Sequence, residues 1–236
     1  MSTGSKVSDK RQRLRRILAP IGQCLGAALI GTYATRHAEI PLIVPYLAVM
    51  LAFGLLDSWF RRNHPDVVTE LVHGGAPLSD RMAFIGGGLL LALHFIVAML
   101  DGGYFHWTRD SLGPISLATQ WGGLILMTAG NLITCWAMLL NPFFSPIVRV
   151  QQERGHQVIS TGPYAVVRHP AYTGVGLAAL SSGVALGSLW SIMPVCGFLL
   201  IYAWRTTVEE KKLAAELPGF TAYSHRVRYR LLPGVW

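Results

Sequence analysis

Long apolar runs, separated by short polar segments, dominate the chain. Four of these runs, residues 17–35, 40–60, 82–100 and 117–140, approach the roughly 20 residues that a membrane-spanning helix needs. A fifth run, residues 175–204, is too long for one upright crossing at about 1.5 Å per residue. The Gly-Ser pair within ALGSLW (residues 185–190), with Pro194 shortly after it, predicts a turn there. We therefore expect two helices packed as a hairpin in this last run.

The runs predict an all-α fold, a polytopic transmembrane bundle of about six membrane helices that includes the C-terminal hairpin. The basic residues support this number. With six spans, 18 of the 20 Lys and Arg residues fall on one side of the membrane, and only Arg36 and Arg109 fall on the other. By the positive-inside rule, both termini and the polar segment 141–173 are expected on the cytoplasmic side. Five spans would place that segment and the C-terminal tail on opposite faces.

The composition agrees with a multi-pass integral membrane protein. Hydrophobic residues make up 52% of the chain and charged residues 14%, and the mean hydropathy is +0.41. The net charge of +8 comes from residues scattered at the ends of apolar runs, so it does not indicate a nucleic-acid partner. Cys24, Cys135 and Cys196 lie inside apolar segments without ligand spacing, and we expect no metal site.

Three regions follow from the pattern. Residues 1–16 form a polar cytoplasmic tail, and no small-residue cleavage site follows it, so the first membrane helix is expected to be retained. Residues 17–140 form a four-helix transmembrane region. His94 and Asp101 in this region are expected to be a packed, hydrogen-bonded histidine and a helix-end cap. Residues 141–236 carry the polar motifs and are the candidate functional core.

The segment GPYAVVRHPAYTG, residues 162–174, is polar and stiff. Its Gly-Pro and His-Pro pairs restrict the backbone, while Arg168, His169, Tyr164 and Tyr172 offer donors and aromatic faces. Such a loop suits a charged heteroaromatic small molecule. The alternative is an interfacial loop whose tyrosines belong to the aromatic belt.

A second polar segment, RTTVEE, follows the expected hairpin. Arg205 and Glu209 are spaced i, i+4 and share one face of a helix. The hairpin would bring them back against residues 162–174 and form a pocket at the cytoplasmic face. The alternative is a solvated helix end in which Glu209 pairs with Arg205 or Lys212.

Together these segments resemble the isoprenylcysteine carboxyl methyltransferase family, membrane enzymes that use S-adenosylmethionine. The resemblance covers about residues 141–233. It is carried by Q-x-E-[KR] from Gln151, GPYxxxRHPxYxG, R-x-x-x-EE-x-x-L from Arg205, and a Y-x-x-x-V tail.

The resemblance implies a cofactor wrapped by the 162–174 loop and a C-terminal helix. Arg205 then corresponds to the arginine that engages the substrate. The residues that correspond to cofactor contacts are Gln151, a strand-like stretch of His156, Gln157, Val158 and Ile159, then Tyr164, His169, Pro170, Ala171, Tyr172 and Glu209.

The expected reaction is methyl transfer from S-adenosylmethionine to a lipophilic acceptor, an isoprenylcysteine-like carboxylate that reaches the site among membrane lipids. One alternative is N-methylation of a phospholipid amine, which needs a base such as His156 or His169. Others are a sterol-type NADPH reductase and a non-catalytic membrane protein. The first four expected helices carry no motif that matches the family, so the sequence does not identify the methyl acceptor.

Overall fold

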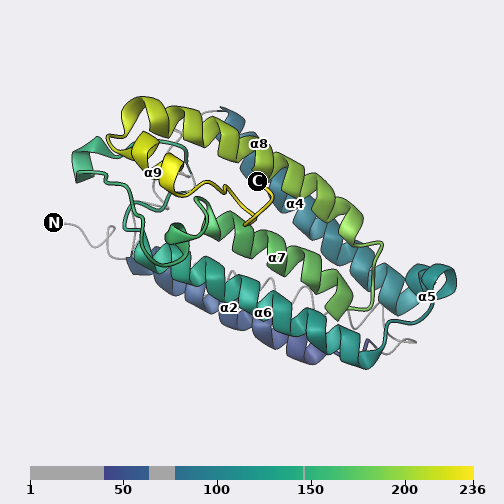
Figure 1. Cartoon of the computed structure of the whole chain (residues 1–236). Coiled ribbons are helices and arrows are strands. Elements are labelled where there is room, and N and C mark those ends of the chain that lie inside the picture. Colours follow the sequence, from purple (N-terminus) through teal and green to yellow (C-terminus); the bar gives the residue numbers. More distant parts are fainter. Residues whose placement is uncertain (1–39, 64–77, 146) are drawn as a thin grey trace, which may run out of the picture.

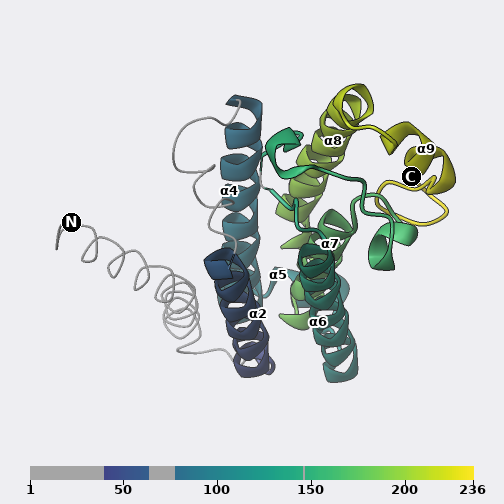
Figure 2. The same cartoon turned by 90° about the vertical axis from the view of Figure 1, so that its left-hand side faces the viewer.

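The computed structural model describes residues 40–63, 78–145 and 147–236, and every regular element in these ranges is a helix. The first expected membrane helix, residues 17–35, lies outside the described residues. Five long helices form the bundle (Figures 1 and 2). They are α2 (Ile43–Asn63), α4 (Leu78–Leu100), α6 (Leu117–Leu140), α7 (Pro170–Ala185) and α8 (Ile192–Glu216). The shorter elements are η1 (Asp101–Phe105), α5 (Trp107–Leu112), η2 (Gln152–Arg154), η3 (Gly162–Ala165) and α9 (Phe220–Arg226).

Three of the described helices are long and apolar enough to cross a membrane: Ile43–Arg62, Ala83–Phe105 and Leu117–Leu140. They match the sequence-predicted spans 40–60, 82–100 and 117–140, and α6 has the predicted ends. The second span is longer than expected because the π-helix η1 continues α4. The stretch 156–159, which the resemblance described as strand-like, has no regular secondary structure.

The predicted hairpin is present. α7 ends at Ala185, α8 begins at Ile192, and Gly187 in the turn between them has a φ of +76°, a conformation that glycine adopts without strain. With 16 residues, α7 is about 24 Å long, which is shorter than a typical hydrocarbon core of about 30 Å. α8 carries its charged residues in its second half, beyond the apolar part.

Glycine brings α6 and α7 into close contact. A Cβ added to Gly130 would lie 2.5 Å from the carbonyl oxygen of Gly174 and 2.7 Å from the nitrogen of Ala178. Such small-residue contacts let helix backbones approach one another within a membrane. This packing fixes the start of α7, where the polar motif of residues 162–174 joins the helix.

We expect Gly130→Ala to lower the stability of the protein by about 1–3 kcal/mol, because the added methyl group has no space between the two backbones. Thermal unfolding in detergent, followed by tryptophan fluorescence, measures the loss. Gly122→Ala is the matched control on the same helix, since its Cβ would have no neighbour within 4 Å. Equal melting temperatures for the two variants would contradict this packing.

Buried polar side chains join α4 to the α7–α8 turn. His94 Nδ1 lies 2.7 Å from the carbonyl oxygen of Ser191, and Nε2 lies 2.6 Å from Ser182 Oγ. Asp101 accepts hydrogen bonds from the backbone and hydroxyl of Thr108 and from the hydroxyl of Ser188. The interpretation of His94 as a packed, hydrogen-bonded histidine is confirmed. Asp101 does more than cap a helix end, because it also ties η1 to the hairpin turn.

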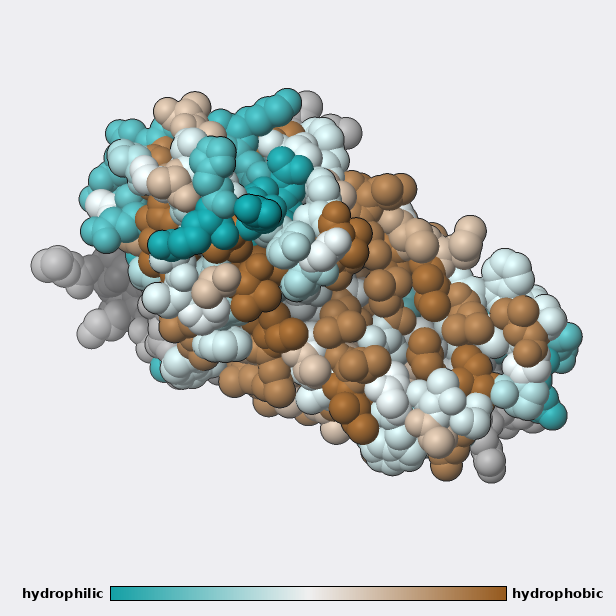
Figure 3. Space-filling view, in the orientation of Figure 1, coloured by the Kyte–Doolittle hydropathy of each residue, from teal (hydrophilic) through white to brown (hydrophobic). Residues whose placement is uncertain are grey.

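The surface separates an apolar body from a polar end. In Figure 3, hydrophobic side chains cover most of the visible bundle, and hydrophilic ones gather over α9 and the neighbouring C-terminal segment. Large apolar side chains on α4, α6 and α8, such as Leu89, Ile125 and Leu200, are more than 60% exposed. An apolar belt of this kind is the surface of a membrane protein.

Candidate active site

The segment 162–174 forms a rigid connection into α7. Gly162 has a φ of +58° and opens the 3-10 turn η3, and Pro170 is the first residue of α7, where its missing N–H leaves no bond unmade. The backbone N–H groups of Arg168 and His169 donate to the carbonyl oxygens of Tyr229 and Arg230, each at 2.9 Å. The C-terminal segment therefore runs along the loop and holds it in place.

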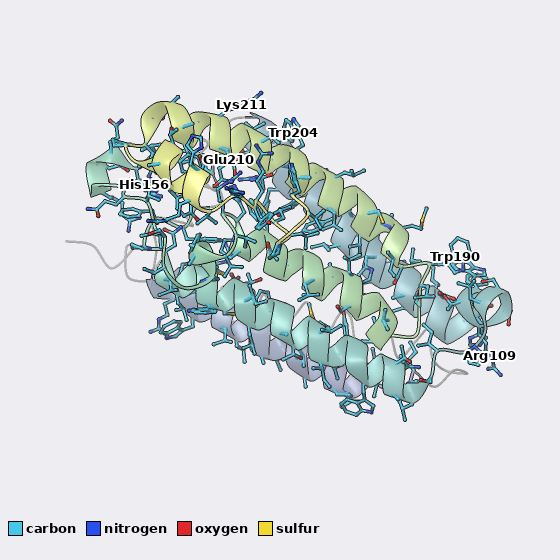
Figure 4. The ribbon with its side chains drawn as sticks, viewed as in Figure 1. Arg109, His156, Trp190, Trp204, Glu210 and Lys211 are labelled. Carbon is cyan, nitrogen blue, oxygen red and sulfur yellow. The ribbon has the colours of Figure 1, made fainter. Side chains whose placement is uncertain are left out.

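Glu210 on α8 is the centre of an ion-pair cluster. Its two carboxylate oxygens accept hydrogen bonds from Arg168 Nε at 2.7 Å and Nη2 at 3.0 Å, a bidentate pair. Arg230 Nε donates at 2.8 Å, and His169 Nε2 lies 3.1 Å away. Because an ionised carboxylate only accepts hydrogen bonds, Nε2 of His169 carries a proton. One carboxylate thus joins α8, the loop and the C-terminal segment; Figure 4 shows Glu210 among these elements.

Burial opposes ionisation of Glu210, but the hydrogen bonds from its three partners outweigh burial and lower the pKa of its carboxyl from 4.5 to about 2. A depressed pKa means that the ionised form stabilises the folded state. This contribution is complete above about pH 4.5 and is lost as the pH falls toward 2.

We therefore expect the stability difference between wild type and Glu210→Gln to shrink as the pH falls from about 4.5 to about 2. Melting temperatures of both proteins in detergent, measured at intervals between pH 6 and pH 2.5, test this. A difference that stays constant across the range would show that the charge of Glu210 does not stabilise the fold.

Tyr172 links the two residues singled out on α8. Its hydroxyl donates to Glu209 Oε2 at 3.0 Å and accepts a hydrogen bond from Arg205 Nε at 3.2 Å. Its ring stacks on His169, with ring centroids 5.6 Å apart and an angle of 2° between the planes. The i, i+4 pair of the sequence analysis is therefore bridged by a tyrosine from α7.

A cleft opens between the loops and the C-terminal half of α8. It encloses about 870 Å³, including its open mouth. Its walls come from residues 141–145 and 147–149, residues 156–159, η3, the start of α7, the end of α8 and α9. Ten of the eleven residues that the sequence assigned to cofactor binding line this cleft: His156, Gln157, Val158, Ile159, Tyr164, His169, Pro170, Ala171, Tyr172 and Glu209.

Gln151 is the one residue of this set that does not line the cleft. It is 1% exposed and is absent from the cleft wall. Its amide donates to the carbonyl oxygen of Phe143 at 2.8 Å and accepts from Arg154 at 2.7 Å, and its backbone N–H meets His156 Nδ1 at 3.2 Å. It supports the loop that carries His156. Arg205 is also outside the cleft wall and reaches it through Tyr172.

The protonation states of two cleft residues follow from their surroundings. Burial, followed by the charges of Arg149 and Arg154, lowers the pKa of His156, which is therefore neutral at pH 7. Burial also raises the pKa of Tyr164 to about 12, so its hydroxyl stays protonated. This hydroxyl lies 3.3 Å from both the Asn141 amide and the carbonyl oxygen of Ala137.

Sequence reasoning missed the roles of Glu210, Arg230 and Asp80. The second glutamate of the EE pair and the alternating arginines of HRVRYR were visible signals for the cluster. Asp80 lies on α4, where it resembles an ordinary acidic residue in the first turn of a helix. Its carboxylate accepts the N–H of Val148 at 3.0 Å and lies 3.7 Å from Arg205 Nη2.

Part of the chain is similar to known proteins. A sequence model described as phospholipid methyltransferase matches residues 118–217. A probable protein-S-isoprenylcysteine O-methyltransferase from rice (Oryza sativa subsp. indica) is 29% identical over 51% of this chain and 62% of its own length. The corresponding enzyme A of Arabidopsis thaliana is 28% identical over 42% of this chain and 52% of its own.

A cobalt-zinc-cadmium resistance protein from Cupriavidus metallidurans is 26% identical over 56% of each chain. The matches thus span between about half and two thirds of the length of these relatives. The matched region holds α6, the loop and the hairpin, which together build most of the cleft. Residues 118–217 of the chain thus resemble phospholipid methyltransferases, and a similar part resembles isoprenylcysteine O-methyltransferases.

Proposed function

We propose that the protein transfers a methyl group from S-adenosylmethionine to a lipophilic acceptor, and that the acceptor group is the carboxylate of an isoprenylcysteine-like molecule. The observation that carries this proposal is the cleft itself. Segments distant in sequence bring His169, Tyr172 and Glu209 together at one end of an apolar bundle, and Arg205 lies directly behind them.

The side chains of the cleft suit S-adenosylmethionine. The cofactor combines an aromatic base, a carboxylate and positively charged groups. Glu209 offers a carboxylate that is 25% exposed, and Tyr172 and His169 offer aromatic faces, both favourable for a cation. Val158, Ile159 and other apolar residues can cover the base.

When bound, S-adenosylmethionine supplies a methyl group on a positively charged sulfur. In our proposal Glu209, Tyr172 and the stretch 156–159 hold the cofactor, and the Glu210 cluster keeps the loop closed over it. In our proposal water is kept from the acceptor oxygen, which is already anionic at neutral pH and needs no base.

In this proposal Arg205 holds the carboxylate of the acceptor. It comes one helical turn before Glu209, on the side toward the apolar half of α8. Tyr202 and Phe198 continue a row of packed aromatic rings in that direction, with ring centroids 4.3 Å apart, and Tyr202 meets Tyr172 edge to face at 5.0 Å. Phe198 is only 1% exposed, so this row belongs to the interior of the bundle.

The orientation in the membrane is part of the proposal. We infer that both termini and the cleft face the cytoplasm, because most basic residues fall in segments on this side. Lys211 and the site lie at one end of the bundle, and Arg109 lies at the other (Figure 4). Arg109 is one of the two basic residues expected outside.

A second candidate is N-methylation of a phospholipid amine, favoured by the description of the matching family. An ammonium group must lose a proton before it attacks. His156 Nδ1 already accepts the N–H of Gln151, so the available base nitrogen is Nδ1 of His169, 4.0 Å from Glu209. The family match also favours a methyltransferase over a reductase or a non-catalytic protein.

The test is methyl transfer by the purified protein in lipid nanodiscs, using S-adenosylmethionine with a labelled methyl group. A prenylated cysteine and phosphatidylethanolamine are offered as acceptors in parallel. We expect a base-labile methyl ester on the prenylated cysteine. Label on phosphatidylethanolamine alone would support the amine reaction, and label on neither acceptor would contradict both proposals.

A further inference from the structure

Asp80 is a buried carboxylate that connects α4 to the site, although the wall of the cleft includes no residue of α4. Its side chain is 7% exposed and that of Arg205 is 6% exposed. One oxygen of Asp80 holds the N–H of Val148 at 3.0 Å, and the other lies 3.7 Å from the guanidinium of Arg205. Asp80 thus contacts both a cleft-forming loop and the arginine behind the cleft.

Arg205 has a second carboxylate close by on its own helix. Glu209 follows it by four residues, a spacing at which opposite charges on a helix meet. In the structure, the Tyr172 hydroxyl stands between them, while the terminal nitrogen Nη2 of Arg205 lies near Asp80. Glu209 faces the cleft.

We propose that Asp80 is a positioning residue that holds the guanidinium of Arg205 toward α4, so that the carboxylate of Glu209 remains available to a cationic group in the cleft. This inference rests on the proposed function, in which Glu209 contacts S-adenosylmethionine.

The physical reason is the need of a buried guanidinium for an anion. A charge that is only 6% exposed is strongly disfavoured unless it is paired. Without the charge of Asp80, Glu209 is the carboxylate that Arg205 can reach from the same helix. Pairing with Arg205 would neutralise Glu209 and weaken its attraction for a positively charged ligand.

The substitution Asp80→Asn separates the two contacts of this residue. The amide oxygen of asparagine can still accept the N–H of Val148, but the charge facing Arg205 is lost. Calorimetric titration with S-adenosylmethionine compares wild type, Asp80→Asn, Arg205→Met and the double variant. We expect Asp80→Asn to raise the dissociation constant about tenfold, Arg205→Met to change it less than about threefold, and the double variant to match Arg205→Met.

Two further variants of Asp80 distinguish loss of its charge from loss of its contact with the loop. Asp80→Ala loses the loop contact as well, so it should weaken binding whether or not Arg205 is present. Asp80→Glu keeps the charge and should bind within about threefold of wild type. It tests the inference even if Asp80→Asn gives little folded protein. Melting temperatures of all variants show which are folded.

The outcomes are distinct. If Asp80→Asn raised the dissociation constant for S-adenosylmethionine by the same factor in wild type and in Arg205→Met, Asp80 would act only by supporting the loop. That result would overturn the inference. Unchanged affinity in Asp80→Asn, with weakened affinity in Glu209→Gln, would overturn it while leaving the proposed function standing. Absence of cofactor binding by folded wild type would overturn both.

Discussion

Replacing Glu210 with alanine is expected to destabilise the protein by about 3–5 kcal/mol, because it leaves buried charges without their partner. Arg168 and Glu210 have side chains that are 8% and 10% exposed. Arg168 would keep its hydrogen bonds to the carbonyl oxygens of Val227 and Arg228, but α8 would no longer be tied to the loop. A loss of this size lowers the melting temperature of a chain this long by roughly 10 °C.

The measurement is thermal unfolding in detergent together with limited proteolysis of the C-terminal segment. Glu216→Ala is the matched control, since Glu216 is an exposed carboxylate on the same helix; we expect it to change stability by less than about 0.5 kcal/mol. Similar melting temperatures for the two variants would show that the Glu210 cluster does not hold the site together.

The second large effect is expected at Arg205. We predict that Arg205→Met lowers the turnover number for a carboxylate acceptor by about 100-fold or more, because the substituted side chain can no longer hold and orient the acceptor. Arg205→Lys keeps the charge but not the planar pair of donors, so it should restore only part of the activity.

A control variant and a binding measurement show whether the loss of turnover is specific to Arg205 and to the acceptor. Lys211→Ala, an exposed basic residue on the same helix, should leave turnover unchanged. The dissociation constant for S-adenosylmethionine should change less than about threefold in Arg205→Met, so that the loss lies in the acceptor step. Full activity of Arg205→Met toward the prenylated cysteine would remove Arg205 from the reaction.

Local sequence patterns predicted the helices well. The ends of α6 and the break between α7 and α8 follow from hydrophobic runs and a Gly-Ser turn, which are encoded in neighbouring residues. The clustering of residues 156–172 near Glu209 followed from the predicted hairpin, since a helix that returns must bring its far end back to the same face. The full number of membrane helices stays a prediction, because residues 17–35 lie outside the described structure.

The contacts that hold the site could not be predicted in the same way. Asp80 and Val148 are 68 residues apart, and no local pattern indicates that they meet. The sequence marked Arg205 and Glu209 as a helical pair, but Tyr172 from another helix intervenes. Gln151 belongs to a recognisable motif, yet its side chain is used inside its own loop. In each case tertiary packing decides which of several chemically reasonable partners is used.

We expect the cleft between the 162–174 loop and α8 to bind the methyl donor. Ultraviolet cross-linking of methyl-labelled S-adenosylmethionine to the purified protein, followed by peptide mapping, tests this expectation. We predict label in peptides from residues 155–172 or 206–213, displaced by excess unlabelled cofactor and reduced in Glu209→Gln. Displaceable label confined to other parts of the chain, or no displaceable label in folded protein, would contradict this expectation.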